Sequence, residues 1–407
     1  MNFYLRPFSY FKQRILNTNY SVVLVSFVIT LFLYLKTDLM DYSHPHFKNI
    51  WDHHKYLWMA KNNTLDFHIA PFCWRILVPS LAKILPFGVE NNFKLIAFLS
   101  VMFTGFFTFK IGQKIFSELI YAYSMMFGYF SLVLATKFVL YDFWLPDAFS
   151  FLLITAGIYS ILIRNDFLFV LITFLGAMTK EVVLFILPLY YTLRAEKLLD
   201  RKLALKTILI SLPALSVFIL IRLLIPSMND NPLYLSNLPD ELKIVHLGSS
   251  QYTYIDAFKQ VISERIKDFS GGLIHQVTLY PFLIYFLFPV FDLKSLIKWG
   301  IKFLPFIFLV YLQIFFAINT DRLVVAGFPA ILILSIYGLK NLIEKAKLHK
   351  MLVIVLTLAF VLMNFFSGIY YSHWLYLRQI FVFVLVVGVF KIHKKLKSNL
   401  RKQNYSF

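Results

Sequence analysis

The sequence predicts an all-α polytopic membrane protein. Of its 407 residues, 59% are hydrophobic and only 15% are charged, whereas a soluble domain carries about 25% charged residues. The mean hydropathy is +0.70. Apolar runs long enough for transmembrane helices recur along the chain. We therefore expect a single transmembrane domain over residues 1–407 with about 11–12 membrane helices.

The distribution of positive charge supports this class. A net charge of +19 could indicate nucleic-acid binding, but the basic residues lie in short segments between apolar runs. That pattern is typical of the cytoplasmic loops of membrane proteins. We expect no nucleic-acid partner, cytoplasmic termini at residues 1–18 and 391–407, and a place in the bacterial inner (plasma) membrane, since eukaryotic targeting features are not evident. The single cysteine, Cys73, excludes an intrachain disulfide.

The apolar runs give the expected order of spans. Those that should cross once cover residues 20–36, 93–115, 119–137, 145–163, 204–225, 279–291, 303–318, 323–339, 351–370 and 375–390. The first outer loop, 37–92, contains an amphipathic segment at 70–86. Because three prolines interrupt this segment, it favours short helices at the membrane interface over a span. A second, long outer loop is expected at 227–277.

The run 167–193 is interrupted by Thr179-Lys180-Glu181. Basic residues flank it on both sides, so both of its ends should lie in the cytoplasm. The run must then enter the membrane and return as two short helices. Each would be about 20 Å long, which is short of a roughly 30 Å hydrocarbon core. We predict a broken hairpin whose tip, Lys180 and Glu181, lies in a recessed, partly wet site near the outer face.

On this topology most acids of the loops lie on the outer face, where the site is expected. Asp52 and Tyr56 are four residues apart and would share one helix face. The simpler interpretation of Asp52 is a helix N-cap. His53 and His54 are adjacent and lack a recognised ligand spacing, so no metal site and no cofactor are predicted, although a divalent metal stays open.

Four motifs resemble one superfamily. Asp52-x-x-x-Tyr56-x-x-x-Ala60 resembles the D-E-x-x-Y-x-x-x-A stretch of polyprenyl-phosphate-sugar-dependent glycosyltransferases of the C-type (GT-C) fold, such as lipid A aminoarabinose transferases and protein O-mannosyltransferases; here His53 replaces the second acid. Three looser matches follow in family order. They are Trp144-Leu-Pro-Asp147-Ala-Phe-Ser-Phe-Leu-Leu, Gly176-Ala-Met-Thr179-Lys180-Glu181 through Pro188, and Asp321-Arg322-x6-Pro329-Ala.

The resemblance implies an inverting transfer of a sugar from a polyprenyl phosphate to a glycan, lipid or protein acceptor on the extracytoplasmic face. It maps the catalytic general base onto Asp52. Cations suit a departing phosphate, and we assign donor-phosphate binding to Arg75, Lys180 and Arg322. His53, Tyr56, Asp147 and Glu181 are expected to line the acceptor site.

Other interpretations remain at this stage. A lipid-linked glycan polymerase or ligase would use similar chemistry on a larger donor. A secondary transporter would explain the broken run, since such helices line transporter sites, and a non-catalytic assembly protein would need neither Asp52 nor Lys180. At the residue level, Arg75 could snorkel from an interfacial helix, Asp147 could cap a span, and Asp321-Arg322 could be a polar turn.

Overall fold

The described part of the chain is built of helices. The computed structural model describes residues 19–41, 52–197, 199–229, 231–239, 242, 263, 293–313, 320–368, 384, 388 and 391, and every regular element within them is helical. Four helices are long and apolar enough to cross a membrane: Val89–Ile115, Arg201–Leu224, Leu293–Leu312 and Arg322–Lys345. Five shorter apolar helices accompany them, so the fold is that of an α-helical membrane protein.

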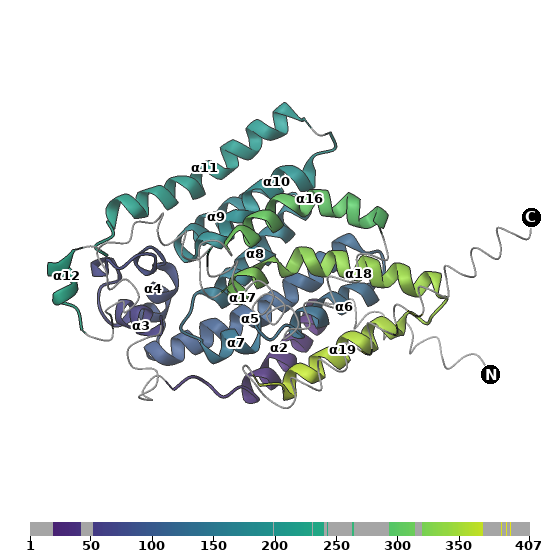
Figure 1. Ribbon diagram of the computed structural model, residues 1–407, viewed down its shortest axis with the longest axis horizontal. Helices are drawn as coiled ribbons and strands as arrows, with labels where there is room; N and C mark the ends of the chain where they lie inside the picture. The colour runs from purple at the N-terminus through teal and green to yellow at the C-terminus, as the bar shows by residue number, and fades with distance from the viewer. Residues whose placement is uncertain are drawn as a thin grey trace, which may run out of the picture.

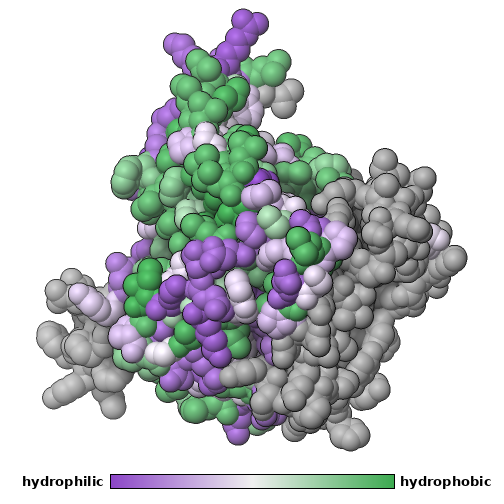
Figure 2. Space-filling view, turned by 90° about the vertical axis from the view of Figure 1, so that its left-hand side faces the viewer, coloured by the Kyte–Doolittle hydropathy of each residue, from purple (hydrophilic) through white to green (hydrophobic). Residues whose placement is uncertain are grey.

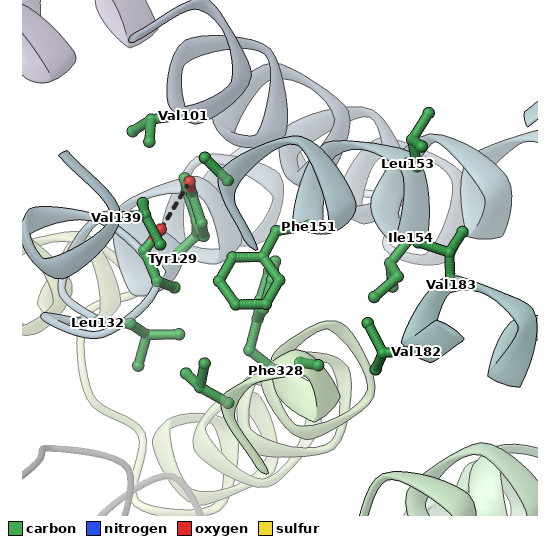
Figure 3. Close-up of a cluster of buried hydrophobic side chains, with 14 of the residues drawn as sticks. Val101, Tyr129, Leu132, Val139, Phe151, Leu153, Ile154, Val182, Val183 and Phe328 are labelled. Atoms are coloured by element: carbon green, nitrogen blue, oxygen red, sulfur yellow. Dashed lines mark hydrogen bonds between the residues drawn. The ribbon is translucent and has the colours of Figure 1, made fainter. Parts of the chain in front are cut away.

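Helix α5 (Val89–Ile115) lies at the centre of the bundle. It packs against α2 (Asn19–Leu35), α6 (Leu119–Phe130) and α8 (Asp147–Leu162). Gly112 permits the close approach of α6, because a Cβ atom there would lie 2.7 Å from the Cα of Ala122. Figure 3 shows the apolar core beside α5, where Val101, Phe151 and Phe328 come from three different helices.

The remaining helices surround this core (Figure 1). On one side α6 packs against α18 (Phe328–Lys345) and α19 (Met351–Phe366). On the other side α8 packs against α9 (Asp166–Thr179), and α9 against α11 (Arg201–Leu224). The outermost helices, α11 and α16 (Leu293–Leu312), expose rows of apolar side chains, as expected of surfaces that face lipid.

The interrupted run folds back on itself, as the sequence predicts. Helix α9 ends at Thr179, the chain is extended at Lys180, and η4 (Glu181–Ile186) returns alongside α9. It continues into α10 (Leu187–Arg194), which packs against α8 and α11. The two ends of the run meet, because Arg194 Nη1 lies 2.6 Å from Asp166 Oδ1. The run is therefore a hairpin and not a single span.

Some predicted boundaries are wrong. The expected span 119–137 ends early, since α6 stops at Phe130 and a separate short helix, α7 (Lys137–Tyr141), follows. The expected span 303–318 begins earlier, at Leu293. The expected span 323–339 is longer at both ends, because it begins with α17 (Thr320–Val324), continues through η9 (Val325–Gly327) and ends with α18 at Lys345. The expected span 279–291 and the N-terminal segment 1–18 lie outside the described residues. So do all of the expected span 375–390 except residues 384 and 388, and all of the tail 391–407 except residue 391.

One end of the bundle carries the short polar elements. The amphipathic segment 70–86 forms η3 (Phe72–Trp74) and α4 (Leu77–Ile84), which lie with α3 (His53–Lys61) and α12 (Pro232–Ser236) at the left of Figure 1. We call this the site end. The His68 carbonyl accepts from Met228 N at 2.9 Å, which joins the segment after α3 to the segment after α11. Viewed from this end, hydrophilic residues gather around the middle of the surface, with an apolar area above them (Figure 2).

Candidate functional site: a charged cluster at the site end

Asp52 lies at the N-terminus of α3 but does not act as its side-chain cap. The helix has Asp52 at its N-cap position with no side-chain cap hydrogen bond. Instead, Oδ2 lies 3.7 Å from Arg322 Nη2, and Oδ1 lies 3.8 Å from Lys55 Nζ. The Asp52 side chain is 31% exposed, so this carboxylate lies between two cations and remains accessible from solvent.

Asp147 and Lys180 form a buried ion pair next to Asp52. Asp147 is the first residue of α8, after Pro146, and Lys180 occupies the extended break between α9 and η4. Their Oδ1 and Nζ atoms are 2.7 Å apart, and the side chains are 2% and 4% exposed. Arg322 Nε lies 3.5 Å from the same Oδ1. A continuous chain of charges therefore runs from Lys180 through Asp147 and Arg322 to Asp52.

Arg75 belongs to a second chain of contacts. Its Nη1 donates to the hydroxyl of Tyr56 at 3.1 Å, and its Nε and Nη2 donate to Glu181 Oε2 at 3.3 and 3.1 Å. The other carboxylate oxygen of Glu181 accepts from Arg222 Nη2 at 3.2 Å. Because Tyr56 lies on the same helix as Asp52 and Glu181 follows Lys180, the two chains are neighbours.

The positions expected to act together are thus brought together at one end of the bundle. Asp52, Asp147, Lys180 and Arg322 are linked by direct ion pairs. Tyr56, Arg75 and Glu181 are linked by direct hydrogen bonds. Arg75 is more than a side chain that snorkels to the membrane interface, because it donates to both Tyr56 and Glu181. Arg322 is more than part of a polar turn, because it lies near both Asp52 and Asp147.

His53 is placed differently from the charged residues. It is fully buried, and its ring centroid lies 4.1 Å from that of His54. Burial, followed by the neighbouring His54 and Lys55, lowers the pKa of His53 to about 3. The imidazole is therefore neutral at neutral pH. Within the residues that the structure describes, no group of three or more His, Cys, Asp or Glu side chains has the arrangement of a metal site.

Three further residues belong to the cluster and were not assigned to the site from the sequence. Lys55 pairs with Asp52, and Arg222 with Glu181. Asp142, between α7 and α8, is 3% exposed, and burial raises the pKa of its carboxyl to about 8 against the opposing effect of Arg322. Arg222 had a visible signal, since a lone charge inside an apolar span is costly unless it is used or paired.

The cluster as a whole is suited to bind an anion. It holds five cations and four carboxyls: Lys55, Arg75, Lys180, Arg222 and Arg322, with Asp52, Asp142, Asp147 and Glu181. Burial raises the pKa of Asp142 and so favours its neutral form, which leaves three arginines in the cluster with fewer opposing carboxylates. Arginine binds phosphate and carboxylate groups through paired N–H donors.

No protein-family model matches this chain, and no curated protein matches it significantly. The GT-C superfamily is therefore connected to this chain only by the resemblance of short motifs described above. The function has to be inferred from the chemistry of the cluster.

Proposed function

We propose that this protein is a glycosyltransferase that moves a sugar from a polyprenyl phosphate to a hydroxyl group of an envelope glycan, lipid or protein. The main support is the position of Asp52. Its carboxylate is accessible, is flanked by Arg322 at 3.7 Å and Lys55 at 3.8 Å, and adjoins an arginine-rich cluster at one end of an apolar bundle. A lipid-linked donor and a polar acceptor could meet at such a boundary.

In the proposed reaction, the acceptor oxygen attacks the anomeric carbon of the sugar. The bond from that carbon to the phosphate oxygen breaks, and its electron pair stays on the phosphate. Asp52 takes the proton of the acceptor hydroxyl as general base. The new bond forms on the face opposite the departing phosphate, so the anomeric configuration inverts. The released polyprenyl phosphate gains negative charge, which nearby cations stabilise.

The cations divide into two groups by their surroundings. Lys180 is buried against Asp147, so in our proposal it does not contact the phosphate. It holds Asp147 in place, and Asp147 in turn positions Arg322. Arg75 and Arg322 are 14% and 16% exposed and are the better candidates for direct contact with phosphate. Tyr56, which accepts from Arg75, would hold that guanidinium in place, and His53 would be a neutral packing residue beside the base.

The proposed location is a bacterial inner membrane with the site end on the extracytoplasmic side. This orientation is supported by the charges at the far end of the bundle. There Lys350 pairs with Glu118, and Arg194 pairs with Asp166, close to the basic segments that the positive-inside rule assigns to the cytoplasm. Labelling of single cysteines from the two sides of sealed vesicles would test it: a cysteine at exposed Asp38 should react only from the outside.

The decisive test is Asp52→Asn. This variant keeps the size of the side chain but removes the base, and general-base catalysis contributes typically about 10²–10⁴-fold. We expect the variant to fold and insert normally and to lose transfer from a polyprenyl-phosphate sugar by at least that factor. Asp38→Asn, an exposed acid of the same loop, is the matched control. Full activity of Asp52→Asn would falsify the assignment.

A secondary transporter is the second candidate, because the broken hairpin carries buried charges at its tip. It predicts substrate flux into proteoliposomes in the absence of any lipid-linked sugar. A polymerase or ligase of lipid-linked glycans would differ from the proposed enzyme in the size of its donor. It predicts no transfer from a donor that carries a single monosaccharide. A non-catalytic assembly protein predicts that Asp52 and Lys180 can both be replaced without loss of function.

A further inference from the structure

Two arginines share one glutamate at the site end. Arg75 donates to Oε2 of Glu181 and Arg222 donates to Oε1, so each carboxylate oxygen faces one guanidinium group. The arginines come from segments far apart in sequence, the first outer loop and the end of α11. Two cations on one monoanion leave the group with an excess positive charge.

The contacts to Glu181 are loose compared with those of its neighbour. The N–O distances between Glu181 and the two arginines range from 3.1 to 3.3 Å, whereas charge-assisted N–H···O bonds are about 2.7–2.9 Å long. Lys180 and Asp147 lie 2.7 Å apart and are almost fully buried. Glu181 is 29% exposed. Of the two carboxylates, Glu181 is therefore the one that an incoming anion can replace.

Both arginines are also held by groups other than Glu181. Arg75 donates to the Tyr56 hydroxyl at 3.1 Å. The Arg222 guanidinium lies 3.4 Å from the ring centroid of Phe218 and 4.4 Å from that of Trp74, and its Nη1 donates to the Phe218 carbonyl at 3.0 Å. Stacking on aromatic faces and these hydrogen bonds would keep the pair in position after the carboxylate leaves.

The surface next to Arg222 is apolar. On α11, Ile219, Leu220, Leu223 and Leu224 are each at least half exposed, and this helix is one of the four able to cross a membrane. A ligand whose charged head reaches Arg222 from this side would keep its apolar part against lipid-facing leucines. The surroundings therefore favour an anion attached to a lipid over a free anion.

We propose that Arg75 and Arg222 form a binding pair for the phosphate group of a lipid carrier, and that Glu181 occupies this pair as a resident anion until the phosphate displaces it. The inference rests on the proposed function for the identity of the carrier. A sugar-bearing phosphodiester has one negative charge, whereas the released monoester has up to two. Two guanidinium groups therefore favour the departing phosphate over the donor, which aids bond cleavage.

Return of Glu181 to the pair would then help the product to leave. The carboxylate competes for the same N–H donors as the phosphate, so it weakens product binding. Glu181 is in this view a positioning residue that sets how long the carrier phosphate stays, while Arg222 contacts the ligand.

The experiment measures binding of polyprenyl phosphate to the purified full-length protein in nanodiscs, with polyprenol and inorganic phosphate as comparison ligands. Arg222→Gln should weaken binding about tenfold or more, since one charge-assisted hydrogen bond contributes roughly 1.4 kcal/mol or more. Arg222→Lys keeps the charge but loses the planar fork, and its affinity should fall between wild type and Arg222→Gln. Glu181→Gln, which removes the competitor, should tighten binding about tenfold.

Arg194→Gln is the matched control. Arg194 also has an ion pair, 2.6 Å from Asp166, and lies over an aromatic ring, that of Tyr190, but at the far end of the bundle. Its replacement should leave the affinity for polyprenyl phosphate unchanged. Thermal unfolding of each variant verifies that the protein is folded before binding is compared.

Three results would overturn the inference: wild-type affinity of folded Arg222→Gln, weaker binding by folded Glu181→Gln, or equal binding of polyprenol and polyprenyl phosphate. Binding of inorganic phosphate as tight as that of polyprenyl phosphate would overturn the lipid assignment. This inference and the proposed function can fail independently. Asp52→Asn should bind polyprenyl phosphate like wild type, and that result does not depend on whether the wild type transfers a sugar.

Discussion

Replacement of Lys180 by methionine tests whether the Asp147–Lys180 pair holds the site end together. The Oδ1 and Nζ atoms are 2.7 Å apart in an almost fully buried setting. At an effective dielectric constant of about 20, two unit charges at that separation attract by about 6 kcal/mol. Most of this attraction is offset by desolvation, yet removal of one partner of a buried pair typically costs about 3–5 kcal/mol, because the other charge stays buried.

The geometry sets the expected value within that range. After Lys180→Met, Asp147 still has Arg322 Nε at 3.5 Å, so its charge is not left alone. We therefore expect a loss of about 3 kcal/mol in the free energy of unfolding. Adding Asp147→Asn should not add a second penalty of the same size, since the buried negative charge is then gone. The sum of the two single effects should exceed the effect of the double variant.

Steric-trapping measurements of unfolding in bicelles give these free energies. Lys94→Met is the control, because Lys94 Nζ lies at the same 2.7 Å from Glu90 Oε1 but the two side chains are 24% and 43% exposed. That variant should lose less than about 1 kcal/mol. If Lys180→Met lost no more than the control, the buried pair would not be what stabilises the break between α9 and η4.

Three other predictions use the same unfolding measurements. Burial raises the pKa of Asp142 from its ordinary value of 3.8 to about 8, so between these values the folded state binds more protons than the unfolded state and loses stability as pH rises. Asp142→Asn should flatten that slope and be at least as stable as wild type at pH 8. The pKa of His53 is lowered from 6.5 to about 3, so His53→Gln should reduce the loss of stability as pH falls through that window. Gly112→Ala should cost about 1–3 kcal/mol, since the new Cβ would lie 2.7 Å from the Ala122 backbone, whereas Gly300→Ala, with its nearest neighbour at 3.9 Å, should cost less.

The broken hairpin shows what the sequence can predict about the fold. Lys180 and Glu181 interrupt an apolar run, and basic residues flank both of its ends. These are local features, and they are sufficient because charge in an apolar run and the side on which basic loops remain both constrain topology. The structure pairs Asp166 with Arg194 across the hairpin, as that reasoning requires.

The end of α6 shows what such local reasoning misses. Residues 131–136, Ser-Leu-Val-Leu-Ala-Thr, are mostly apolar, so nothing in their hydropathy marks the end of a helix. The helix nevertheless stops at Phe130, and Asn364 of α19 donates to the Phe130 carbonyl at 2.7 Å and to Thr136 Oγ1 at 3.0 Å. A carbonyl left over at a helix end needs such a partner. The partner of the Phe130 carbonyl lies 234 positions further along the chain, so local hydropathy cannot reveal it.

The same limit applies to the roles of the charged residues. Each lone charge in an apolar segment indicates that a partner or a ligand exists, but the sequence does not say which. Lys180 and Arg222 carry the same signal. In the structure Lys180 is buried at 2.7 Å from Asp147, whereas Arg222 is partly exposed and shares Glu181 with Arg75. The first arrangement satisfies the charge within the protein, and the second leaves donors that an anion can compete for. In our proposal Arg222 therefore joins Arg75 in direct contact with the phosphate, and Lys180 does not. The choice between Arg222 and Lys180 depends on distances and burial, which no sequence motif contains.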